Sequence, residues 1–171
     1  LKGRTHALSK IVNKLHANGF VKGWRNELYP ISTSFYKPPI IEIERAAAPL
    51  FGVKSFGVHL NGYVKKKNRT YLWVGKRSIK KATGAGKFDQ LVAGGQPTGI
   101  TVKNNLLKEC MEEASISNKL VKKSVPVGTI SYLTTRKEGL RNDTLFCFDL
   151  LLPENFQPYN TDGEVECFYL W

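Results

Sequence analysis

The chain has 171 residues, of which 42% are hydrophobic and 23% charged, and these fractions exclude wholesale disorder. The length predicts one domain with a small additional lobe and is sufficient for a hydrophobic core. The longest apolar stretches are only a few residues, which excludes a membrane-spanning helix and predicts no membrane partner.

Charge is distributed unevenly along the chain, whose formal net charge is +12. Residues 1–85 contain 17 Lys and Arg against three acidic residues, a net charge of +14. Residues 86–171 contain nine against 11, a net charge of −2. A basic half predicts a polyanionic partner, and charge alone leaves open whether this is a nucleic acid or a phosphorylated small molecule.

The three cysteines favour a reducing compartment. Cys110, Cys147 and Cys167 are odd in number, and their spacing matches no metal-binding or disulfide pattern. The N-terminal residues also lack the apolar core of a signal peptide. We therefore expect an intracellular protein with reduced thiols, in the cytoplasm by default, with targeting to an organelle as the open alternative.

Residues 1–52 predict a small α+β lobe. Apolar residues recur at helical spacing over residues 7–15, and Asn18-Gly19 predicts the end of that helix. Residues 24–28 are typical of a short strand that ends at the following Tyr-Pro pair. Residues 40–50 favour either a strand or a strand that leads into a short helix.

From residue 53 onwards the pattern predicts a larger α+β domain, residues 53–171. Alternating apolar residues predict a hairpin with a basic tip at residues 65–69. The predicted strands cover residues 56–64, 71–74, 125–133, 145–151 and 164–171, and one central helix covers residues 102–114. Polar residues at 141–143 predict the turn before the fourth of these strands.

Three carboxylates in the central helix carry the strongest chemical signal. Glu109, Glu112 and Glu113 follow a glycine-rich loop and stand three and four residues apart, so they share one helix face. Three like charges on one face are destabilising unless a cation lies among them, and Mg²⁺ prefers oxygen ligands. The alternative is an ordinary solvated helix face.

This stretch resembles the Nudix box, G-x5-E-x7-R-E-U-x-E-E-x-G-U, where U is a bulky apolar residue. The box glycine corresponds to Gly94, and its three core glutamates correspond to the three carboxylates of the central helix. Three positions depart from the box: Ile100 stands for Glu, Lys108 for Arg and Ser115 for Gly. Lysine keeps the charge of arginine but loses its planar fork, so we expect looser geometry around Glu109.

Nearly the whole chain resembles the thiamine-pyrophosphokinase-related subgroup of Nudix proteins, which have a lobe before the Nudix domain. The matching blocks are residues 24–29, 43–47, 50–52, 57–63 and 91–95. In that subgroup an apolar residue replaces the first box glutamate, as Ile100 does here, whereas Ala85 departs from a subgroup proline. The resemblance implies an α/β/α sandwich with a mixed sheet. It also implies metal-dependent hydrolysis of an organic diphosphate, with thiamine diphosphate or its oxidised, damaged forms as substrates.

The hypothesis that follows places one to three Mg²⁺ or Mn²⁺ ions on the box residues. The metal ligands are the Gly94 carbonyl, Glu109, Glu112 and Glu113. A metal-activated water attacks a phosphorus of the diphosphate, and the general base is Glu109 or Glu164. Glu166 is the alternative to Glu164, because strand alternation puts both side chains on one face.

Four further residues are candidates for substrate binding. Arg77 and Lys81 precede the glycine-rich loop and are predicted to contact the substrate diphosphate, the alternative being a solvated basic turn. Trp24 and Arg25 are predicted to stack on a ring of the substrate and contact its phosphate. For Trp24 the alternative is a core residue that anchors the lobe.

Two other hypotheses compete with a diphosphate hydrolase. The first is a nucleic-acid-binding module on a Nudix scaffold, although an RNA-binding surface interleaves exposed aromatic residues with its Lys and Arg. The second starts from Trp171, where the sequence ends without the helix that closes a Nudix sheet. This predicts a truncated, weakly active protein with an exposed apolar patch that associates into a homodimer.

Overall fold

The computed structural model describes residues 1–81 and 83–171, which form two compact units. The first unit consists of Leu1–Phe56, Gly95–Ile100 and Ser131–Thr144, and the second of Gly57–Gly94, Thr101–Ile130 and Leu145–Trp171. Helices and a mixed sheet occur together, so the predicted α+β class is confirmed. None of the described helices has the length and hydropathy needed to cross a membrane. A domain boundary after residue 52 stays a prediction.

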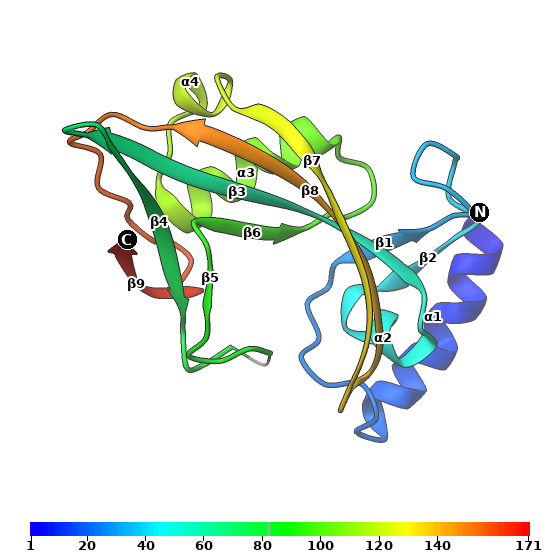
Figure 1. The fold of residues 1–171 in the computed structure, drawn as a ribbon. Helices are drawn as coiled ribbons and strands as arrows, with labels where there is room; N and C mark the ends of the chain where they lie inside the picture. Colours follow the sequence, from blue (N-terminus) through cyan, green and yellow to red (C-terminus); the bar gives the residue numbers. More distant parts are fainter. Residues whose placement is uncertain (82) are drawn as a thin grey trace. The chain divides into compact units, whose positions relative to one another are not determined.

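In the first unit, α1 (Lys2–Ala17) packs on β2 (Ile41–Glu44), which pairs antiparallel with β1 (Leu28–Ile31), as Figure 1 shows. β2 continues into a 3₁₀ turn (Arg45–Ala47) and the short helix α2 (Ala48–Phe51). The core of this unit consists of Val12, Val21, Tyr29, Ile43, Ala47 and Ala48. The predicted first helix is therefore confirmed, and the strand that leads into a short helix is the alternative that occurs.

The strand predicted at residues 24–28 is wrong, because β1 begins only at Leu28 and continues through Pro30. Asn26 has a left-handed backbone with φ of 57°, which interrupts an extended strand. The Glu44 carboxylate, rather than a neighbouring strand, accepts hydrogen bonds from two backbone N–H groups of this segment at 3.0 and 3.2 Å. Proline is tolerated in β1 because a strand with a single neighbour has an open side that needs no N–H donor.

The larger sheet has seven strands in the described part of the chain. They are β3 (Lys54–Lys66), β4 (Arg69–Arg77), β5 (Phe88–Gln90), β6 (Val92–Gly95), β7 (Val125–Arg136), β8 (Gly139–Leu151) and β9 (Val165–Leu170). Their order is β5-β4-β3-β8-β7, with β6 paired to β3 and β9 paired to β4. The sequence pattern misses β5 and β6, because both are short and lie in a glycine-rich stretch.

The basic tip of the first long hairpin is confirmed. Lys67 and Asn68 form the turn between β3 and β4, both with positive φ, 45° and 64°. Positive φ at both central residues is typical of the two-residue turn that suits the twist of a hairpin.

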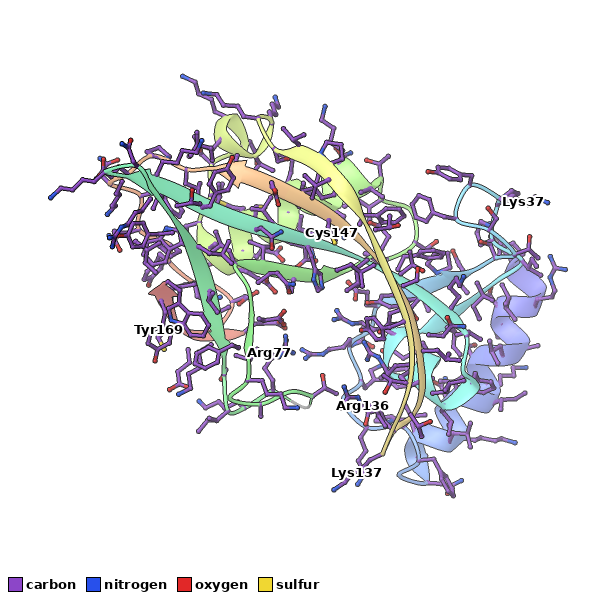
Figure 2. The ribbon with its side chains drawn as sticks, in the orientation of Figure 1. Lys37, Arg77, Arg136, Lys137, Cys147 and Tyr169 are labelled. Carbon is purple, nitrogen blue, oxygen red and sulfur yellow. The ribbon has the colours of Figure 1, made fainter. Side chains whose placement is uncertain are left out.

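The turn predicted at residues 141–143 is wrong, because these residues lie inside β8. The chain turns instead at residues 137–138, and Figure 2 shows Lys137 at the end of the β7–β8 hairpin. Asp143 is buried and accepts hydrogen bonds from the Tyr132 hydroxyl (2.7 Å) and the Arg141 guanidinium (3.0 Å). These polar residues therefore form a hydrogen-bonded contact between the two strands of the hairpin rather than its turn.

Helix α3 (Val102–Ala114) confirms the predicted central helix, and the short helix α4 (Asn118–Val121) follows it. Leu106 and Cys110 of α3 are buried in the same core cluster as Val58 of β3. Burial raises the pKa of the Cys110 thiol, so this cysteine stays protonated in the core. This packing fixes the orientation of the helix that carries the box glutamates.

Apolar side chains are exposed along β7, the edge strand of the larger sheet. They are Val125, Val127, Ile130, Tyr132 and Leu133. Strand alternation puts Val125, Val127 and Leu133 on one face and Ile130 and Tyr132 on the other. The predicted apolar patch and the association into a homodimer both stay predictions.

We expect Gly139→Ala to destabilise the first unit. A methyl group on Gly139, where φ is 130°, would overlap the carbonyl oxygen of Pro49 in α2. Gly128→Ala is the matched control, because φ there is 153° and nothing lies within 4 Å of the added methyl. In urea unfolding Gly139→Ala should lose about 1–3 kcal/mol more than Gly128→Ala. Equal losses would show that the β8–α2 contact is not tight.

Candidate active site

Glu113 lies at the centre of the candidate site and is almost fully buried, at 5% exposed. One carboxylate oxygen accepts a hydrogen bond from the backbone N–H of Ala93 at 2.8 Å. Burial raises the pKa of Glu113 to about 8; the Ala93 hydrogen bond opposes this shift, and the nearby charges of Glu109, Glu164 and Asp162 add to it. Without a cation, this carboxyl group is therefore held largely in its protonated form at neutral pH.

Two more carboxylates face Glu113. Oxygen atoms of Glu113, Asp162 and Glu164 all lie within 4.8 Å of one another. Sequence reasoning proposed Glu164 for this position but missed Asp162. The signal that could have indicated Asp162 is its place in an Asp-Gly-Glu segment directly before the last strand.

The loop before β9 is held against the C-terminal end of α3 by hydrogen bonds. Thr161 donates hydrogen bonds to the Glu112 carbonyl from its backbone N–H (3.0 Å) and its hydroxyl (2.7 Å). The Asn160 amide donates to the Glu113 carbonyl at 3.2 Å and to the Asp162 carboxylate at 2.7 Å. The last carbonyls of a helix have no partner within the helix, so these bonds satisfy them and bring Asp162 beside Glu113.

Ser115 takes the place of the box glycine at the end of α3. Its backbone is left-handed, with φ of 52°, which is the conformation for which glycine is preferred at a helix end. The Ser115 hydroxyl donates a hydrogen bond to the Tyr159 carbonyl at 2.7 Å. This bond compensates for the backbone strain and adds a further link to the loop.

A bulge separates Glu164 from Glu166, which strand alternation predicts to share one face. The pairing of β4 with β9 changes register between Lys76 and Arg77, which leaves Glu166 as an extra residue in β9. Glu166 is paired with Lys76 at 3.2 Å, whereas Glu164 faces Glu113. The structure thus brings Glu164, and not Glu166, into the acidic cluster.

Glu109 and Glu112 are arranged differently from Glu113. Glu109 is buried against Gly94, and a side chain at Gly94 would overlap its carboxylate. Lys108 bridges the other two glutamates, at 3.1 Å from Glu109 and 3.2 Å from Glu112. The three box glutamates are therefore close in the helix, but only Glu113 belongs to the cluster with Asp162.

Arg77 and Lys81 lie next to this cluster, and their contact with a phosphate stays a prediction. The Lys81 ammonium is paired with Glu164. Arg77, labelled at the end of β4 in Figure 2, is paired with Asp89 at 2.9 Å and donates to the Thr83 carbonyl at 3.0 Å. A small pocket is lined by Gly75, Arg77, Asp89, Gln90, Ala93, Glu113, Glu164 and Val165. Ala82, in the adjoining 81–86 stretch, lies outside the described residues.

Trp24 and Arg25 belong to the first unit. The Trp24 indole N–H donates to the Asn26 side chain at 2.8 Å, and its ring lies 4.6 Å from the ring of His16. Arg25 donates its backbone N–H to Glu44. Their contact with a substrate stays a prediction.

The acidic cluster fits a divalent cation by its chemistry. Its donors are all oxygen atoms, their mutual distances allow one ion to contact all three side chains, and Glu113 is buried without a cationic partner in the described part of the chain. Mg²⁺ and Mn²⁺ prefer such carboxylate oxygens.

Comparison with known proteins agrees with this geometry. The family model for a domain of unknown function (DUF4743) matches residues 1–55. The chain is 50% identical over 167 residues to Nudix hydrolase 20, chloroplastic, and 49% identical to Nudix hydrolase 24, chloroplastic, both from Arabidopsis thaliana. Each alignment covers 98% of this chain but only 45% and 46% of the relatives. The chain belongs to the Nudix family. It thus spans less than half the length of these two relatives.

The Nudix fold is also seen in solved structures. A MutT/nudix family protein from Enterococcus faecalis matches with a TM-score of 0.57 and 12% identity, over 69% of this chain and 43% of the other. This likeness concerns the fold alone and confirms the Nudix architecture predicted from the box.

The buried carboxyl group predicts a pH-dependent stability for this Nudix protein. Because the pKa of Glu113 is higher in the folded state than its usual 4.5, the stability that its protonation contributes is complete below about pH 4.5 and is lost as the pH rises towards 8. In EDTA, the parent should therefore lose unfolding free energy relative to Glu113→Gln as the pH rises from 5 to 8. The loss should be about a few kcal/mol, as the size of the pKa shift implies.

The measurement is thermal or urea unfolding of both proteins across this pH range. Glu154→Gln, which changes an exposed glutamate in the same unit, is the control and should follow the parent. Adding Mg²⁺ at pH 8 should stabilise the parent and not Glu113→Gln. A parent and a variant with parallel pH profiles would contradict the assignment.

Proposed function

We propose that this chain hydrolyses a diphosphate linked to an organic group, with Mg²⁺ or Mn²⁺ as cofactor. The observation that carries the proposal is the buried Glu113 facing Asp162 and Glu164 in a pocket that Arg77 also lines. A buried carboxyl group without a cationic partner among the described residues, beside the positively charged Arg77, suits a metal-bound diphosphate. The names of the two plant relatives support hydrolysis.

The box residues have distinct roles in this proposal. The Gly94 carbonyl, Glu109, Glu112, Glu113 and Glu164 would hold one to three divalent cations, and we add Asp162 because its carboxylate lies beside that of Glu113. A divalent cation bound there supplies charge neutralisation and lowers the pKa of the attacking water. Glu164 lines the pocket and Glu109 does not, so we assign to Glu164 the acceptance of the proton from that water.

Arg77 and Lys81 bind the diphosphate oxygens. Each already contacts a carboxylate, Asp89 and Glu164 respectively, so the substrate competes with an internal anion for each cation. Glu164 would hold Lys81 less tightly with a divalent cation bound, because this carboxylate would then share its charge between two cations. Lys81 is then available for the leaving phosphate.

The resemblance to the thiamine-related subgroup supports thiamine diphosphate or its oxidised forms as the substrate. Trp24 and Arg25 remain the proposed contacts for the organic part of a substrate. The names of the two plant relatives refer to the chloroplast, which supports an organelle over the cytoplasm as the compartment.

A phosphate-release screen with Mg²⁺ tests this function. The compounds are thiamine diphosphates, nucleoside diphosphate sugars, dinucleoside polyphosphates and isoprenyl diphosphates, and we expect release from at least one thiamine diphosphate. Glu113→Gln should lower the rate at least about a hundredfold, because it removes a charged metal ligand. Glu166→Gln is the control and should keep the rate. If Glu112→Gln and Glu113→Gln both keep full metal-dependent release, the site assignment is wrong.

A further inference from the structure

The first unit contains a cavity of its own, with a volume of about 240 Å³. One wall is the inward side of α1, and the other is formed by residues 24–28 and by β2. The acidic cluster and the pocket that Arg77 lines contribute no residue to this cavity, whereas Trp24, a proposed contact for the organic part of the substrate, does. A cavity of this volume accommodates a compound with a single ring and a short side chain.

The charge of the cavity is opposite to that of its surroundings. Residues 1–56 contain nine Lys and Arg but only three acidic residues, Glu27, Glu42 and Glu44. Two of these three, Glu42 and Glu44, line the cavity, and no Lys, Arg or His in the described part of the chain does. The cavity is thus lined by two carboxylates and by no basic side chain of the described residues. This lining disfavours a phosphate and favours a positively charged ligand.

The two carboxylates differ in what they can offer a ligand. Glu44 accepts hydrogen bonds from the backbone N–H groups of Arg25, Glu27 and Ala46, so its role is to hold the chain. Glu42 accepts one hydrogen bond, from the Thr98 hydroxyl at 2.5 Å, and its second oxygen accepts none from a described residue. Glu42 is in no ion pair within the described chain. Its charge is therefore available.

Trp24 supplies a flat apolar surface in the same cavity. The contacts of its indole with Asn26 and His16 fix the orientation of the ring. A fixed aromatic ring and a carboxylate together bind a cationic aromatic compound through stacking, cation–π attraction and a charge-assisted hydrogen bond.

We infer that this lobe binds a small organic cation with an aromatic ring, between Trp24 and Glu42. Binding does not depend on hydrolysis of a diphosphate by the second unit. One oxygen of Glu42 already accepts the Thr98 hydroxyl, so the ligand binds to the second oxygen.

Nuclear magnetic resonance titration of the whole chain tests this inference with three probes of one shape: benzylammonium, benzyl alcohol and benzoate. The protein has three tryptophans, so the indole N–H signals of Trp73 and Trp171 serve as internal references for that of Trp24. We expect benzylammonium to shift the Trp24 signal selectively and saturably, benzyl alcohol to bind at least about tenfold more weakly, and benzoate not to bind.

Two variants complete the experiment. Glu42→Gln should weaken benzylammonium binding about tenfold, while the Trp24 indole signal of the ligand-free variant stays dispersed at its folded position, which reports an intact first unit. Glu138→Gln, the same change at the hairpin turn of this unit, should bind as the parent does. Glu113→Gln should also bind normally even if it abolishes hydrolysis, so the two proposals can fail separately. Equal binding of benzoate, unchanged affinity in Glu42→Gln or uniform shifts of all three signals would overturn the inference.

Discussion

The hydrogen bonds between the end of α3 and the loop before β9 determine where the acidic cluster of the second unit lies. Helix α3 ends with carbonyl groups that have no partner within the helix, and Tyr159, Asn160 and Thr161 satisfy those of Ala114, Glu113 and Glu112. Because these hydrogen bonds hold the loop against the helix end, Asp162 and Glu164 lie beside the side chain of Glu113. The acidic cluster is thus a consequence of how a helix end is satisfied.

Crowded carboxylates then impose a second constraint. Burial and neighbouring charges raise the pKa of Glu113, so the group must bind either a proton or a metal ion. Lys108 relieves the same repulsion at Glu109 and Glu112, in the position where the Nudix box has arginine. The lysine reaches both glutamates with a single ammonium group, which replaces the fork of an arginine by one shared point charge.

In the first unit, acidic side chains lie inside a cavity and the basic side chains lie outside it. Its many cations lie outside the cavity beside α1, and two of its three carboxylates lie inside. Glu44 shows why sequence patterns failed there, because its side chain takes over hydrogen bonds that a neighbouring strand would otherwise make for residues 24–28. A net charge of +12 therefore conceals two acidic sites with different proposed ligands.

The sequence by itself determined the α+β class, the central helix, the basic hairpin and the Nudix box, because these depend on local periodicity and fixed spacing. Asp162 and the choice between Glu164 and Glu166 depended on the tertiary structure. The first results from a loop that binds a helix end, and the second from one extra residue in β9. The turn placed at residues 141–143 failed for the same reason, since Asp143 is satisfied by Tyr132 from the other strand of the hairpin. Patterns of neighbouring residues report local structure, whereas partners distant in sequence are decided only when the chain folds.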